Sequence, residues 1–234
     1  MKVTQFDTLY QLTFFPNLFP INCYIIEEET ELTLIDTGLA SHGPKIIEVI
    51  KSLSKPLTTI LLTHGHDDHV GSVDILKKEF PDAQLCISAR DSLLLNGDKR
   101  LLDDEGMLPI KGGISTKIKS SPDRLLYEQN TVGSLKVISS PGHTPGSISL
   151  FDERNRFLIA GDAFQTKGGI AVAGTLKLTF PFPAFATWDK NRSLNSAKQL
   201  ASLHPKLLAV GHGTCITDPY EAMMKAIQRA ENTF

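Results

Sequence analysis

Three histidines and two aspartates are concentrated in one short run of the sequence, which extends from Thr63 to His69. Imidazole and carboxylate groups are suitable ligands for zinc, iron or manganese, and the run contains none of the cysteine thiolates that are typical of structural zinc sites. The residue types and their spacing therefore predict a catalytic metal centre, with a histidine-rich surface turn as the alternative. The candidate ligands in the run are His64, His66, Asp68 and His69.

A buried strand is expected directly before this run, because residues 59–62 are β-branched or apolar and follow Pro56. The histidines then begin at the carboxyl end of a strand, where open α/β folds place ligands and catalytic groups. Apolar residues recur at helical spacing after the run, so a helix is expected to begin near Asp68. These apolar residues are Val70, Val73, Leu76 and Phe80.

Three later apolar runs also end in a potential ligand that is flanked by small residues. Each of these residues alone is consistent with an ordinary turn. Four ligands are enough for one metal ion, whereas seven provide three ligands for each of two ions and one shared carboxylate. The complete set therefore favours a site for two metals. The three segments are 135–146, 157–162 and 207–213, and their candidate ligands are His143, Asp162 and His212.

The composition is that of an ordinary globular protein. The chain has 234 residues, of which 41% are hydrophobic and 21% charged, and its net charge is −2. We expect a single domain over residues 1–234. Because lysines and arginines form no long run, no nucleic-acid partner is expected. The sequence shows neither a leader pattern nor an apolar stretch long enough to span a bilayer, so we expect a cytoplasmic protein without a membrane partner.

The cysteines and two further histidines have structural interpretations. Cys23, Cys86 and Cys215 are far apart in the sequence, which favours free thiols in a reducing compartment. Cys215 follows the last candidate ligand closely enough to approach a metal, but a small side chain in the protein interior is the favoured interpretation. His42 and His204 lie in expected loops, and we expect both to be solvated.

Taken together, these residues resemble the metallo-β-lactamase-fold hydrolases. The family signature H-x-H-x-D-H is similar to His64–His69, and the later single ligands of the family match His143, Asp162 and His212 in order and context. The resemblance extends from Asp36 to His212. It implies a four-layer αββα sandwich, in which two mixed β-sheets pack back to back between helices, with a dinuclear metal site at one edge.

The resemblance also implies a role for each ligand. Asp36 resembles an early strand-end aspartate of the family that supports a metal-binding histidine, and such a carboxylate fixes the imidazole tautomer. A plain turn residue is the alternative for Asp36. The first metal would be bound by His64, His66 and His143, the second by Asp68, His69 and His212, and Asp162 would bridge both.

The expected chemistry is hydrolysis. Two metal ions, zinc with iron or manganese as alternatives, would lower the pKa of a shared water molecule and supply a hydroxide near neutral pH. The chain has no serine in a Gly-x-Ser-x-Gly motif that would serve as the nucleophile instead. Asp68 is expected to be the catalytic residue that orients the nucleophile or moves its proton.

Differences between the branches of the family indicate the substrate class. Asp162 stands where true class B β-lactamases commonly have a cysteine, and it resembles the bridging aspartate of thioester, lactone and phosphodiester hydrolases. The chain continues only to Phe234 after the last ligand, so the glutathione-binding helical region of glyoxalase II proteins is not expected. We therefore expect a small ester, thioester or lactone as substrate. The alternatives are an iron-dependent redox enzyme similar to persulfide dioxygenases, and a phosphodiesterase or nuclease.

Two segments without candidate ligands are also of interest. Residues 94–121 are charged and contain glycines, which predicts a long loop that covers the site as a lid, or a disordered linker. Residues 179–188 combine four aromatic residues with two prolines. This second segment suits core packing, or an apolar wall that contacts the substrate through Phe180 or Phe182.

The remaining periodic segments predict the supporting helices. Residues 45–53 form one helical stripe, and another helix begins at Asp189. The last helix is expected from Asp218, because Pro219 and Glu221 suit a capped start. Strands followed by amphipathic helices occur on both sides of about residue 125, as in an internally duplicated fold.

Overall fold

The computed structural model describes residues 1–115 and 117–234, which form two compact units. The first unit comprises Met1–Asp98 and Gly113–Leu126, and the second unit comprises Lys99–Gly112 and Tyr127–Phe234. The boundary after Leu126 agrees with the pattern that repeats on either side of about residue 125. The segment Lys99–Gly112 departs from this pattern, because it belongs to the second unit. The expectation of a single domain stays a prediction.

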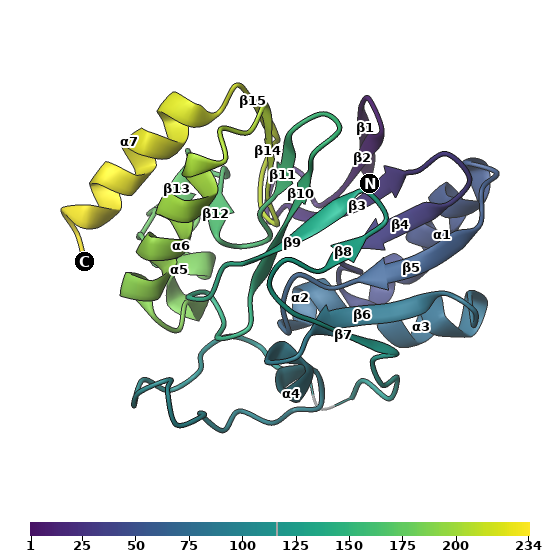
Figure 1. The fold of residues 1–234 in the computed structure, drawn as a ribbon, viewed down its shortest axis with the longest axis horizontal. Helices are drawn as coiled ribbons and strands as arrows, with labels where there is room; N and C mark the ends of the chain where they lie inside the picture. Colours follow the sequence, from purple (N-terminus) through teal and green to yellow (C-terminus); the bar gives the residue numbers. More distant parts are fainter. Residues whose placement is uncertain (116) are drawn as a thin grey trace. The chain divides into compact units, whose positions relative to one another are not determined.

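The first unit is built on a seven-stranded mixed sheet whose strands follow one another in sequence order (Figure 1). The pairs from β1 to β4 are antiparallel, and the pairs from β4 to β7 are parallel. The carboxyl ends of β4 and β5 therefore lie at the same edge of the sheet, where Asp36 and His64 follow. The strands are β1 (Lys2–Phe6), β2 (Leu9–Phe14), β3 (Ile21–Glu27), β4 (Leu32–Ile35), β5 (Leu57–Leu61), β6 (Gln84–Ser88) and β7 (Arg124–Leu126).

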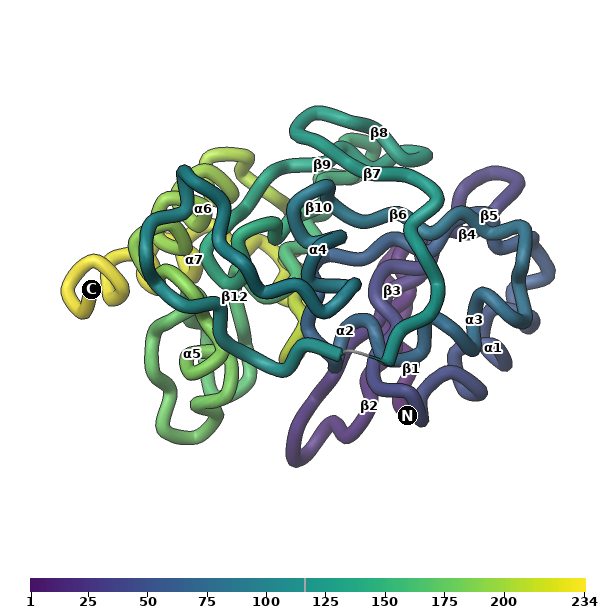
Figure 2. The backbone as a smooth tube through the Cα atoms, turned by 90° about the horizontal axis from the view of Figure 1, so that it is seen from below, coloured from purple at the N-terminus to yellow at the C-terminus, as the bar shows by residue number. Residues whose placement is uncertain are grey.

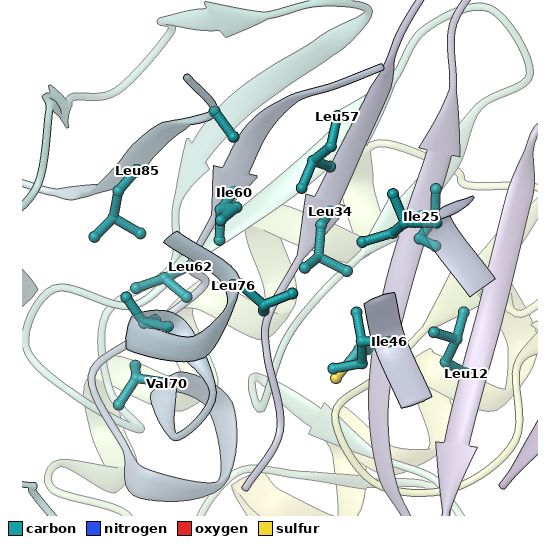
Figure 3. Close-up of a cluster of buried hydrophobic side chains, with 14 of the residues drawn as sticks. Leu12, Ile25, Leu34, Ile46, Leu57, Ile60, Leu62, Val70, Leu76 and Leu85 are labelled. Atoms are coloured by element: carbon teal, nitrogen blue, oxygen red, sulfur yellow. The ribbon is translucent and has the colours of Figure 1, made fainter. Parts of the chain in front are cut away.

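Helices of the first unit bury their apolar sides against one face of this sheet. Figure 3 shows Ile46 and Leu76 from two of these helices in one cluster with Leu34 and Ile60 from the strands. This burial is the main source of stability for such short helices. The helices are η1 (Ala40–His42, a 3-10 turn), α1 (Gly43–Ser52), α2 (Asp67–Val70), α3 (Val73–Glu79) and α4 (Asp91–Leu95).

The helix expected from near Asp68 is present, but it is divided into α2 and α3 at Gly71 and Ser72. The backbone N–H of Gly71 donates to the carbonyl of Gly38 at 2.8 Å. A Cβ atom on Gly71 would lie only 2.7 Å from the backbone nitrogen of Ala40. Two backbone segments meet here at a distance that only glycine permits, and this contact interrupts the helix.

The second unit contains a six-stranded mixed sheet and a separate two-stranded sheet. In the larger sheet β11 and β14 are parallel, and the other pairs are antiparallel. The carboxyl ends of β11 and β14 therefore lie together, and Asp162 and His212 follow them. The strands expected before the three later ligands are confirmed. The strands are β8 (Thr131–Val132), β9 (Leu135–Ser139), β10 (Ile148–Asp152), β11 (Phe157–Ile159), β12 (Phe164–Gln165), β13 (Ala171–Val172), β14 (Leu207–Ala209) and β15 (Ile216–Thr217).

Two long helices pack against the larger sheet of the second unit, where Leu200 and Ile227 share a buried cluster with Leu158 and Leu208. The first of these helices begins as expected, because the carboxylate of Asp189 accepts a hydrogen bond from the backbone N–H of Arg192 at 3.0 Å. The helices of this unit are α5 (Phe182–Ala186), α6 (Lys190–Ser202) and α7 (Tyr220–Glu231).

The expected cap of the last helix is not formed. Helix α7 begins after Pro219, and no side chain caps it at this position. Asp218 has a φ of 47°, which is the left-handed region rather than the extended conformation that an N-cap residue normally adopts. The capping box predicted from Asp218 and Glu221 is therefore wrong.

The long connection between α4 and β7 is confirmed as a loop, since its described residues form no helix or strand (Figure 2). It begins later than expected, because Leu94 and Leu95 are buried residues of α4. Within the second unit, the indole N–H of Trp188 donates to the carbonyl of Leu108 in this loop at 2.7 Å. The lid function of residues 94–121 stays a prediction, and Thr116 lies outside the described residues.

The two large mixed sheets with their helices confirm the expected α/β class. Among the residues that the structure describes, no helix combines the length and the apolar composition that a membrane span requires.

Candidate metal centre

Three buried imidazoles come together in the first unit, in the turn after β5 and in α2. The ring centroid of His64 lies 4.8 Å from that of His66 and 4.0 Å from that of His69. Each of the three side chains is at most 3% exposed. The candidate ligand atoms of His64 lie within 4.8 Å of those of each neighbour. These imidazoles form a compact donor cluster that is withdrawn from water.

Asp68 adds a carboxylate to this cluster. Its Oδ1 atom lies 4.0 Å from Nε2 of His69, and its side chain is 24% exposed. Because the three imidazoles are buried, Asp68 is the member of this cluster that solvent reaches most easily. It is therefore the best placed of the four to exchange a proton with water.

A buried carboxylate directly after β4 supports the cluster. Oδ2 of Asp36 lies 2.8 Å from Nδ1 of His69. Asp36 also accepts hydrogen bonds from the backbone N–H and the hydroxyl of Thr63, both at 2.8 Å. The left-handed φ of 58° at Asp36 is tolerated by aspartate better than by most residues. The supporting contact expected for Asp36 is confirmed.

These hydrogen bonds decide which nitrogen His64 and His69 present to the cluster. An ionised carboxylate only accepts, so His69 donates through Nδ1 and keeps the lone pair of Nε2 for a metal. The hydroxyl of Thr63 gives its hydrogen to Asp36, and its oxygen therefore accepts from Nδ1 of His64, 3.0 Å away. The Nε2 atoms of both histidines are buried. One aspartate thus orients two imidazoles, one of them through Thr63.

The turn between His64 and His66 is held by Asp91 of α4. Asp91 is buried, and its Oδ2 accepts a hydrogen bond from the backbone N–H of Gly65 at 2.9 Å. A Cβ atom on Gly65 would lie 2.7 Å from Cβ of Leu94. The ligand turn therefore needs glycine at this position, because α4 packs directly against it.

Three candidate ligands from separate strand ends converge in the second unit. Nε2 of His143 lies 3.3 Å and Nε2 of His212 lies 3.2 Å from the same oxygen, Oδ2 of Asp162. All three side chains are buried. The parallel pairing of β11 and β14 brings Asp162 and His212 together, and the turn after β9 supplies His143.

Thr187 fixes the tautomer of His143. The Thr187 hydroxyl donates to the carbonyl of Pro183 at 2.7 Å, so its oxygen accepts from Nδ1 of His143 at 3.1 Å. A neutral His143 then directs the lone pair of Nε2 toward the Asp162 oxygen. Two acceptors in this position repel each other unless a positive charge lies between them, either a proton or a metal ion. This donor set therefore fits a divalent cation.

The structure gathers four of the seven candidate ligands in the first unit and three in the second. The union of the two clusters in one dinuclear site stays a prediction. Local sequence patterns do not single out three supporting residues, namely Thr63, Asp91 and Thr187. Thr63 stands next to His64 in the opening run, and this adjacency is a signal in the sequence, whereas Asp91 and Thr187 are 26 and 44 residues away from their partners.

His42 is not solvated, contrary to the expectation from sequence. Its ring stacks on Phe14 with centroids 3.7 Å apart, and its Nδ1 accepts a hydrogen bond from the backbone N–H of Leu39 at 3.1 Å. Burial lowers the pKa of His42 to about 4, so the ring is neutral at pH 7. His42 is packed against the aromatic residues Phe14 and Phe15 at the end of β2, which periodicity does not reveal. His204, by contrast, is exposed as expected.

The cysteines are free thiols. Cys23 and Cys86 are buried, and burial raises the pKa of Cys23 well above its ordinary value and that of Cys86 to about 11. Both therefore stay protonated and unreactive at neutral pH, as expected. Cys215 is half-buried, so the interior position that was favoured for it is reached only in part. Its approach to a metal stays the alternative.

Known proteins match this chain in both sequence and fold. The family model of the metallo-beta-lactamase superfamily matches residues 16–212. The chain is 55% identical over 231 residues to the uncharacterized protein YobT of Bacillus subtilis (strain 168), with 99% of each chain covered. It is 30% identical over 159 residues to the hydroxyacylglutathione hydrolase GloC of Haemophilus influenzae, covering 65% of this chain and 70% of the relative. A crystal structure of TTHA1623 in a di-iron-bound form is similar with a TM-score of 0.67 and 27% identity, covering 91% of this chain and 96% of the other.

Proposed function

The chain belongs to the metallo-β-lactamase superfamily, and on this basis we propose that it is a dinuclear metal-dependent hydrolase of small esters, thioesters or lactones. The clusters of the two units together form the metal site in this proposal. His64, His66 and His143 would hold the first metal, Asp68, His69 and His212 would hold the second, and Asp162 would be a ligand of both.

The observation that carries the proposal is that hydrogen bonds at Nδ1 leave the Nε2 lone pairs of three histidines available to a metal. Asp36 and Thr63 leave Nε2 of His64 and His69 as the donor atoms, and Thr187 does the same for His143. Metal-binding histidines need such partners, because these fix the ring orientation and raise the basicity of the ligand. A closed structural zinc site would use four ligands, usually with cysteine among them.

When bound, the metal ions supply a hydroxide nucleophile at neutral pH and polarise the acceptor oxygen of the substrate. Asp68 orients the nucleophile and accepts its proton, since its carboxylate is the solvent-accessible one in the first cluster. Asp36 keeps His69 in the ligating tautomer throughout turnover, because it stays buried and hydrogen-bonded.

The substrate class is supported by the nature of the bridging residue and by one relative. Asp162 is a carboxylate where true class B β-lactamases commonly have cysteine, which resembles thioester and lactone hydrolases. The relative GloC is named as a hydroxyacylglutathione hydrolase. We propose zinc as the metal.

An iron-dependent redox enzyme is the second candidate, because the similar structure of TTHA1623 holds two irons. The two candidates differ in metal content and in reaction. The protein should be expressed under metal control, analysed for metal, and assayed in its zinc, manganese and iron forms against thioesters, lactones and phosphodiesters. Two zinc ions per chain and turnover of a thioester or lactone are expected. Oxygen consumption by the iron form alone, with no hydrolysis by any form, would overturn the proposal.

A further inference from the structure

The segment from Phe180 to Thr187 contacts a candidate metal ligand at each of its ends. At its start, the ring centroid of Phe180 lies 5.5 Å from that of His212. At its end, the hydroxyl of Thr187 accepts from Nδ1 of His143. Helix α5 (Figure 1) lies between these contacts and has five residues, or about 7 Å of helix. The segment therefore runs along the ligand cluster of the second unit.

This segment is apolar, and yet part of it is exposed. Helix α5 has the sequence FPAFA, without any charged or hydrogen-bonding side chain. Phe182 is 52% and Phe185 is 67% exposed, whereas Phe180 is buried. Core packing therefore accounts for Phe180 but not for Phe182. Two exposed aromatic side chains, three residues apart on one helix, indicate a place where another apolar group binds.

Phe180 connects the exposed ring to the metal site. Its ring centroid lies 5.4 Å from that of Phe182 at an interplanar angle of 70°, which is the edge-to-face arrangement that aromatic pairs prefer. The same buried ring packs on His212. Phe182 is thus held one aromatic ring away from a candidate ligand.

We propose that Phe182 forms an apolar wall for the acyl chain of the substrate, so that the protein prefers thioesters or esters of medium-length, unbranched alkyl acids to acetyl compounds. This inference rests on the proposed function. Phe182 determines specificity and Phe180 positions it. A charged acyl group is excluded from this wall, because α5 offers no side chain that would pair with it.

The kinetic test uses acetyl, butyryl and hexanoyl thioesters of one small thiol with the metal-loaded protein. In the wild type kcat/KM should rise by up to about fourfold for each methylene that is buried. Phe182→Ala should reduce kcat/KM for the hexanoyl compound, mainly through KM, by about tenfold more than for the acetyl compound. Leu178→Ala is the matched control, since Leu178 is 88% exposed but precedes the segment between the two ligand contacts. It should leave all three values unchanged.

A binding measurement separates this inference from the proposed function. Trp188 is the single tryptophan of the chain and is buried directly after the segment, so its fluorescence reports binding there. Hexanoate should bind more tightly than acetate, and Phe182→Ala but not Leu178→Ala should abolish the difference. If no form hydrolyses thioesters and this binding pattern is still found, the proposed hydrolase activity is refuted, whereas the binding role of Phe182 is supported.

Three results would refute the proposal that Phe182 forms an apolar wall for the acyl chain. The first is a wild type whose turnover and binding do not depend on chain length. The second is an equal loss on acetyl and hexanoyl substrates in Phe182→Ala. The third is a shift of oligomeric state in both the Phe182 and the Leu178 variants without any change in chain-length preference, which would assign the apolar surface to a protein contact.

Discussion

The ligand clusters of the two units both contain imidazoles that are held in one orientation, but different groups orient them. In the first unit the ligands are neighbours in sequence, and a buried carboxylate, Asp36, orients two of them. In the second unit the ligands come from three strand ends, and a neutral hydroxyl, Thr187, orients one of them. A charged acceptor binds more strongly than a neutral one. The comparison therefore indicates that the first cluster is the more rigid and the second depends more on the packing around it.

The largest effect is expected at Asp68, the solvent-accessible carboxylate of the first cluster. Asp68→Asn keeps the size of the side chain but removes its ability to accept a proton, so kcat should fall by about 10²–10⁴-fold with little change in KM. The measurement is steady-state kinetics on a variant whose metal content equals that of the wild type. Unchanged turnover in such a metal-replete variant would refute the assigned role.

An added methyl group beside either cluster should lower the free energy of unfolding, and the loss should be larger beside the second cluster. A Cβ atom on Gly142 would lie 2.3 Å from the backbone nitrogen of Ser193, and Gly142 has a φ of 140°. A Cβ atom on Gly65 would lie 2.7 Å from Cβ of Leu94, which is a less severe overlap at a position without a left-handed φ. Gly65→Ala should cost about 1–3 kcal/mol and Gly142→Ala more than about 3 kcal/mol. Denaturant unfolding measures both, and the reverse order would contradict the comparison.

Acid should weaken the first unit through His42. Its pKa in the folded protein, about 4, is below the ordinary value of 6.5, so the unfolded chain binds the proton more tightly. The stability contribution is complete above pH 6.5 and is lost as the pH falls from 6.5 to 4, by up to about 3 kcal/mol. The free energy of unfolding of wild type and His42→Asn should be measured from pH 7 to pH 4. Parallel curves for the two proteins would show that His42 does not carry this sensitivity.

The smallest effects are expected on metal affinity, when the two supporting residues Asp36 and Thr187 are compared directly. Asp36→Asn should weaken metal binding by about 10- to 100-fold, because the amide carries no charge and satisfies fewer of the hydrogen bonds. Thr187→Val should weaken it by less than about tenfold, since only a neutral hydrogen bond is lost. Competition with a chelator measures both affinities. Equal losses would mean that the charge on Asp36 brings no advantage.

Local patterns in the sequence were sufficient for several parts of the fold and the site. The strand before the opening run, the strands before the three later ligands and the capped start of α6 all follow from periodicity and turn chemistry over a few residues. The expected solvation of His42 and the expected cap at Asp218 were wrong, because packing against Phe14 and a left-handed backbone are decided by neighbours outside that range.

The sequence by itself determined the kind of chemistry, since imidazoles and carboxylates at this spacing are metal ligands wherever the chain places them. Only the tertiary structure decided which nitrogen His64, His69 and His143 present, and that the ring of Phe182 is exposed. Thr187 meets His143 across 44 residues, and Asp91 meets Gly65 across 26. Hydrogen bonds are effective over about 3 Å, so they depend on where the fold brings atoms together and not on their separation along the chain.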